Sequence, residues 1–76
     1  MDSHEHSLRM AIIRTEAYRQ EGELEILHLT KQLNSLSKPD KYTVKKLNLK
    51  LAKKRLEVDE WEVELEEMRE KLKRYN

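Results

Sequence analysis

The stretch that decides the fold is Leu29–Leu51, which reads LTKQLNSLSKPDKYTVKKLNLKL. Apolar residues recur at intervals of four and three residues before Pro39, and at intervals of three and four after it. This alternation places apolar side chains along one stripe of an α-helix. Because proline is excluded from a helix interior, the stretch predicts two helices joined by a turn at the proline.

Both stripes continue outward from this stretch as heptad seams. The N-terminal seam comprises Leu8, Ile12, Thr15, Arg19, Gly22, Ile26, Leu29, Leu33 and Leu36. The C-terminal seam comprises Val44, Leu47, Leu51, Lys54, Val58, Trp61, Leu65, Met68, Leu72 and Tyr75. Pairing them from Leu8 with Met68 to Leu33 with Val44 gives partner numbers that sum to 76 or 77. We therefore predict an all-α fold, an antiparallel two-helix hairpin that forms a coiled coil.

We expect one domain, residues 1–76, with helices over about residues 5–36 and 41–73 and a turn over residues 37–40. Asp2, followed three residues later by Glu5, can act as a loose capping pair for the first helix. Pro39 suits a first helical turn, and Asp40 is expected to cap the amides ahead of Val44.

The composition agrees with long helices. Charged residues make up 41% of the chain against about 25% in ordinary globular proteins, and aromatic residues make up 5%. The chain has no cysteine, which excludes disulfides and cysteine-based zinc sites. No stretch is apolar enough to span a membrane, and the start lacks the features of a signal peptide, so we expect a cytoplasmic protein.

Each helix carries a second apolar stripe on the side away from its seam. A two-helix hairpin buries only one stripe per helix, so the second stripes should form an exposed apolar strip, which soluble monomers seldom tolerate. We therefore predict a homodimer that packs as a four-helix bundle, with a helical segment of another protein as the alternative occupant. The other interpretation is that these are scattered surface leucines. The expected contact residues are Ile13, Leu24, Leu27, Tyr42, Leu49, Leu56 and Val63.

Polar layers interrupt the seams. In the predicted register Thr15 faces Trp61, Arg19 faces Val58, and Gly22 faces Lys54, where it would leave space for the lysine stem. Polar core positions of this kind fix the register and partner number of coiled coils.

The second helix is strongly dipolar in charge. Eight Lys or Arg residues lie between Lys38 and Arg55 against one acid, and seven acids and no base lie between Glu57 and Glu67. Antiparallel contact between two such helices would set basic halves against acidic halves. A second hypothesis is a helical bundle that binds nucleic acid through phosphate contacts. Its expected residues are Lys45, Lys46, Lys50, Lys53 and Arg55.

The sequence offers little for catalysis. Gly22 is the only glycine, which excludes a glycine-rich phosphate loop, and a thin rod has no concavity for a substrate. We expect His4, His6 and His28 to face solvent, and we predict no metal and no cofactor. The sequence thus favours a non-enzymatic interaction module, a small regulator or assembly adaptor, with the nucleic-acid-binding bundle as the alternative.

Overall fold

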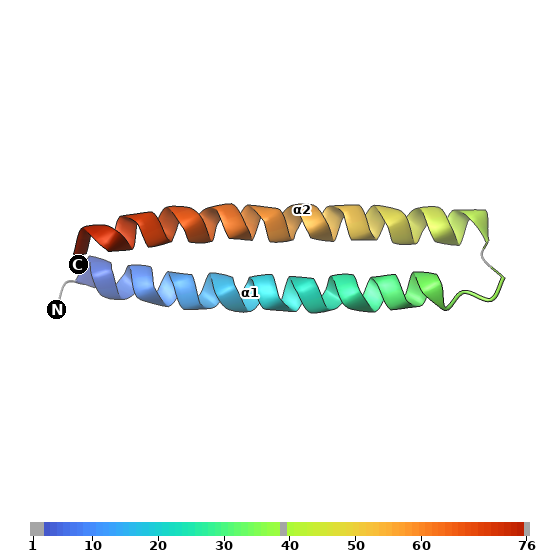
Figure 1. Ribbon diagram of the computed structural model, residues 1–76, viewed down its shortest axis with the longest axis horizontal. Coiled ribbons are helices and arrows are strands. Elements are labelled where there is room, and N and C mark those ends of the chain that lie inside the picture. The colour runs from blue at the N-terminus through green and yellow to red at the C-terminus, as the bar shows by residue number, and fades with distance from the viewer. Residues whose placement is uncertain (1–2, 39, 76) are drawn as a thin grey trace.

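The computed structural model describes residues 3–38 and 40–75, and over these residues it is all-helical. Helix α1 spans Ser3–Asn34, helix α2 spans Lys41–Leu72, and a short 3-10 helix, η1, spans Lys73–Tyr75. The two long helices lie side by side in opposite directions, with both chain ends at the same end of the rod (Figure 1). The predicted antiparallel hairpin is confirmed.

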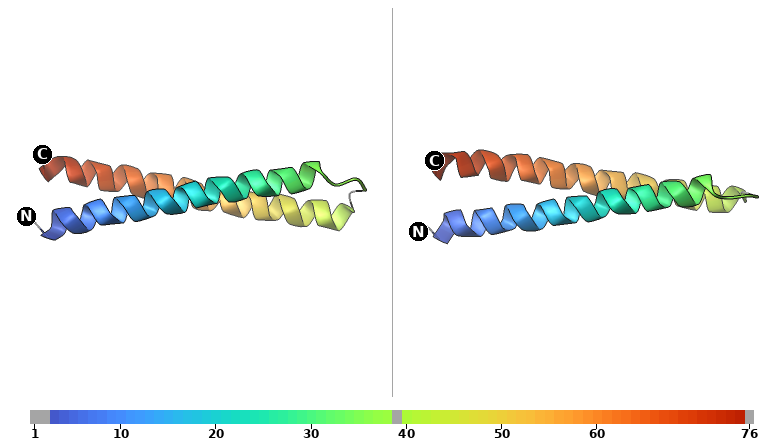
Figure 2. Two further views of the ribbon diagram at one scale, coloured as in Figure 1. Left: turned by 90° about the horizontal axis from the view of Figure 1, so that it is seen from below. Right: turned by 60° about the horizontal axis from the view of Figure 1, so that its bottom comes forward.

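The molecule is a rod with extents of 58 × 14 × 14 Å. Its two helices cross gently along their length (Figure 2), as expected for heptad seams that must stay in contact. The accessible surface is 6210 Å². A compact monomer of this 9.2 kDa mass would expose about 4,900 Å². The rod therefore exposes more surface than a compact protein of the same mass.

The helix ends differ in detail from the sequence prediction. Helix α1 ends at Asn34, two residues before the predicted end. Its last turn is closed by the Ser35 amide, which donates to the carbonyls of Lys31 at 3.0 Å and Gln32 at 3.3 Å, and by the Ser35 hydroxyl, which donates to the Gln32 carbonyl. Asp40 occupies the N-cap position of α2, but its carboxylate makes no capping bond to an amide. It accepts a hydrogen bond of 3.3 Å from the Thr43 hydroxyl instead, so the predicted amide cap is wrong. The predicted roles of Asp2 and Pro39 lie outside the described residues.

The core consists of the predicted seams. Leu65 is the most buried side chain, at 2% exposure, and every other seam residue from Leu8 to Leu72 is buried or half-buried. Tyr75, the last predicted seam residue, is 41% exposed. The buried apolar residues among those described are Ile12, Leu29, Leu51, Val58 and Leu65.

The predicted register of the two seams is wrong by about one helical turn. A Cβ atom added to Gly22 would lie 2.7 Å from Cγ2 of Val58 and 2.9 Å from Cζ3 of Trp61, so Gly22 faces these two residues and not Lys54. The numbers 22 and 58 sum to 80. In a register where the numbers of facing residues sum to 80, the buried residues Thr15 and Leu65 face each other, and so do Leu29 and Leu51. The prediction of space at Gly22 holds, but valine and indole fill it.

The connection between the helices explains the shift. Helix α1 stops at Asn34, and the chain runs on past its end before it turns back, so α2 begins farther out along the rod (Figure 1). Partner numbers that sum to 76 or 77 imply a symmetric reversal at Lys38-Pro39, which would have set the helix ends level. Both registers preserve apolar contacts along the seam, because a heptad pattern repeats at each layer.

A substitution at Gly22 tests the close packing of this residue against Val58 and Trp61. Alanine at Gly22 is expected to lower the melting temperature, because the new methyl group needs space that Val58 and Trp61 occupy. Overpacking costs about 1–3 kcal/mol, against about 1 kcal/mol that alanine gains over glycine in a helix. Thermal unfolding followed by circular dichroism measures the balance. In a Val58→Ala background the cost should shrink, and a Gly22→Ala chain that melts higher would contradict the register.

Among the residues that the structure describes, two ion pairs connect the helices. Lys54 reaches across the seam to Glu25 at 3.0 Å and also pairs with Glu57 at 2.9 Å on its own helix. Arg69 pairs with Glu16 across the opposite half of the rod. The hydrogen bonds to Glu57 and then Glu25 raise the pKa of Lys54 above its usual 10.5. Because the pKa of Lys54 is higher in the folded chain than in the unfolded chain, its ion pairs stabilise the fold at any pH below the pKa of the unfolded chain. This stabilisation is lost as the pH rises through the pKa of the folded chain.

Candidate protein interaction surface

The outer faces of both helices carry large apolar side chains that are largely exposed in the described part of the hairpin. All seven residues predicted as contact residues are more than half exposed, from Leu27 at 52% to Leu24 and Tyr42 at 66%. Met10 also lies on the outer face of α1 and is 45% exposed. We call the α1 set, Met10, Ile13, Leu24 and Leu27, the α1 stripe, and the α2 set, Tyr42, Leu49, Leu56 and Val63, the α2 stripe.

The two stripes lie on opposite edges of the rod. At about 100° per residue, Leu56 stands about 140° around the helix from Leu51 and about 160° from Val58, both of which face α1. On α1, Leu24 likewise stands about 160° around the helix from the seam residues Gly22 and Ile26. Each stripe therefore points away from the other helix. The single apolar strip expected from the sequence is wrong, since the hairpin has two separate apolar edges.

Charged side chains flank the α2 stripe. Lys46, Lys50 and Lys53 lie on one flank, and Lys45 and Arg55 lie on the other, with the stripe between them. All five are exposed. Among the described residues these five make no ion pair within the hairpin. Within the same part of the chain, the acids Asp59, Glu60, Glu62, Glu64, Glu66 and Glu67 likewise make none. These eleven charges along α2 thus have no ion-pair partner in the described part of their own chain.

Tyr18 is an exposed aromatic residue to which the sequence analysis gave no role. It is 45% exposed, and its ring centroid lies 6.0 Å from that of Trp61. The indole is thereby held between Tyr18 and the notch at Gly22. Tyr18 directly precedes the seam residue Arg19, and this position indicated that its ring lies beside the seam. It indicates a contact with Trp61 only in the observed register.

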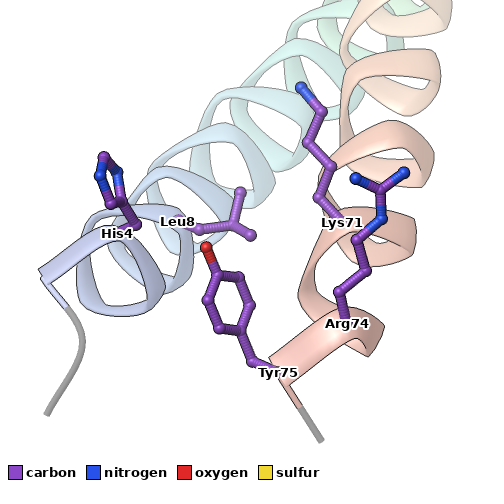
Figure 3. Close-up of a pocket in the computed structure, with 5 residues that line it drawn as sticks. All are labelled: His4, Leu8, Lys71, Arg74 and Tyr75. Carbon is purple, nitrogen blue, oxygen red and sulfur yellow. The ribbon is translucent and has the colours of Figure 1, made fainter.

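Hollows on the rod are shallow and open. Those on the two stripes are each lined by residues of one helix only, including Leu56 and Val63 on α2, and Leu24 and Leu27 on α1. At the end that holds both termini, another lies between η1 and the start of α1 (Figure 3). There the Tyr75 ring lies toward Leu8, while Lys71 and Arg74 extend along α2 and η1. These shapes suit contact with an elongated partner more than enclosure of a small molecule.

The sequence predicts no metal site and no membrane-spanning stretch. His4, His6 and His28 are exposed, and over residues 3–38 and 40–75 no three His, Cys, Asp or Glu side chains gather closely enough to hold a metal ion. Neither α1 nor α2, as far as they are described, contains a stretch apolar and long enough to cross a membrane.

Comparison with known proteins adds no relative. The chain matches no protein-family model, no curated protein and no solved structure.

Proposed function

We propose that the chain is a non-enzymatic protein–protein interaction module, a small regulator or assembly adaptor, that self-associates through the outer faces of its helices. One observation carries the proposal: large apolar side chains more than half exposed run along both edges of a rod 14 Å thick. Large exposed apolar side chains aligned along one face of a helix are typical of interaction sites in soluble proteins. The charged flanks around it are suited to orient a partner.

A homodimer is the simplest assembly that covers one of these two apolar edges. Because each stripe points away from the other helix, one contact covers only one edge of each hairpin. Two hairpins joined at one edge place four helices side by side in a layer. This layer differs from the four-helix bundle predicted from the sequence, which would place the helices around a common core.

Light scattering on the full chain tests the proposal. We expect a mass of twice the 9.2 kDa chain that falls toward a single chain on dilution over a roughly hundredfold range. A mass of 9.2 kDa at every concentration would overturn self-association.

The nucleic-acid alternative predicts a different behaviour in the same buffers. Lysine contacts to phosphates weaken steeply as salt concentration rises, whereas burial of leucine is little affected by salt. Addition of duplex DNA or RNA during the scattering measurement separates the two. A complex that forms at low salt and is lost at moderate salt, without a dimer in its absence, would favour nucleic-acid binding.

A further inference from the structure

The charges of α2 reverse sign at Leu56. Every charged residue from Lys41 to Arg55 is basic, and every charged residue from Glu57 to Glu67 is acidic. Leu56 lies between the two halves, at 60% exposure and on the line of the α2 stripe. A helix with this pattern is complementary to an antiparallel copy of itself, provided that the two copies meet at this residue.

We propose that α2 pairs with α2 of a second copy in antiparallel orientation, about a twofold axis that passes Leu56. The inference rests on the proposed self-association and specifies its surface and geometry. In this pairing Leu56 meets Leu56 of the second copy, and Leu49 meets Val63 of the second copy, because both number pairs sum to 112. Leu49, Leu56 and Val63 of the α2 stripe are thereby covered by their own counterparts, whereas Tyr42 lies opposite Glu70 of the second copy.

The flanks of the stripe become ion pairs in the same geometry. An antiparallel twofold brings equivalent flanks together, so residues on one flank meet residues on the same flank of the second copy. On one flank Lys46 meets Glu67 and Lys53 meets Glu60. On the other, Lys45 meets Glu66. None of these side chains makes an ion pair within the described hairpin, so the contact breaks none of the ion pairs already present.

The alternative surfaces fit a second copy less well. Parallel pairing of α2 would set each lysine against the same lysine and each glutamate against the same glutamate. On α1, acids and bases are mixed along Arg14, Glu16, Arg19, Glu21 and Glu23. Glu16 and Glu23 also have ion-pair partners already, Arg69 and Arg19. Charge therefore selects α2 and the antiparallel orientation.

Single cysteines test the axis directly, because the chain has none of its own. The probes are Leu56→Cys, Leu49→Cys and Val63→Cys, oxidised at low protein concentration and read by mass on non-reducing gels. Directly facing helix positions bring Cα atoms within the range of a disulfide, which is about 4.4–6.8 Å. Residues 49 and 63 lie about 21 Å apart along a helix, so equivalent cysteines at either position cannot meet.

We expect Leu56→Cys to form a linked dimer by itself. Leu49→Cys and Val63→Cys should each stay unlinked alone and form a linked dimer when mixed. The matched control is Leu24→Cys on the opposite edge, which should stay unlinked. A linked Leu49→Cys homodimer, or an unlinked mixture of Leu49→Cys and Val63→Cys, overturns the inference. If the unsubstituted chain still scatters as a dimer, self-association survives that result; if it scatters as a monomer, both proposals fail.

Discussion

Replacing Leu49 and Leu56 with glutamate is expected to convert the dimer into a folded monomer. Both side chains are about three-fifths exposed in the single hairpin, so their loss removes little of its core. In the proposed dimer Leu56 lies on the twofold axis, and glutamate there would bury two like charges against each other. A buried charge without a partner costs several kcal/mol, which raises the dissociation constant by at least about a hundredfold. Light scattering gives the mass, and circular dichroism checks that the helices persist.

The matched control for this variant lies on the other edge. Leu24 and Leu27 of the α1 stripe are 66% and 52% exposed, so Leu24→Glu with Leu27→Glu changes charge and apolar surface by a similar amount. This chain should keep the mass of a dimer. If the control dissociates and the α2 variant does not, the contact surface is the α1 stripe.

Alanine at Leu65 is expected to cause a large loss of stability. Leu65 is 2% exposed and packs in the seam opposite the small residue Thr15, so little material nearby can fill the cavity. Such truncations cost about 2–5 kcal/mol. A hairpin of 76 residues is expected near the lower end of the usual range of about 5–15 kcal/mol. The melting temperature should fall by more than about 10 °C, measured at a fixed protein concentration because dimerisation itself adds stability.

The same substitution at an exposed leucine provides the comparison. Leu24→Ala should change the free energy of unfolding by no more than about 0.5 kcal/mol, since Leu24 is 66% exposed. Equal losses at the two positions would mean that the seam is not the core of the folded chain.

The core was predictable from the sequence because burial follows the heptad spacing. Leu29 and Leu51 stand in the stretch around the turn, and both are buried in the structure. The exposure of Leu49 and Leu56 was equally predictable, since they stand half a helix turn away from the seam. That spacing also contained the signal that the two stripes lie on opposite edges, because a side chain opposite the seam must point away from the other helix.

The register was not predictable from the same pattern. A heptad seam offers nearly equal apolar contacts when it slips by one layer, so the choice depends on side-chain shape and on the connection. Gly22 receives Val58 and Trp61 at distances that a Cβ atom would not permit. Lys54 reaches Glu25 across the seam at 3.0 Å. These contacts depend on how far the chain runs past Asn34 before α2 begins, and that distance is not encoded in the apolar spacing.

The placement of the two stripes on opposite edges has a consequence for the dimer as a whole. If two hairpins join along α2, both α1 stripes face outward at the two ends of the layer, turned away from each other. The assembly then has two identical helix-binding edges and is bivalent. A partner that carries two matching helices, or that is itself paired, would bind such an assembly with an avidity well above that of one edge, provided its spacing fits.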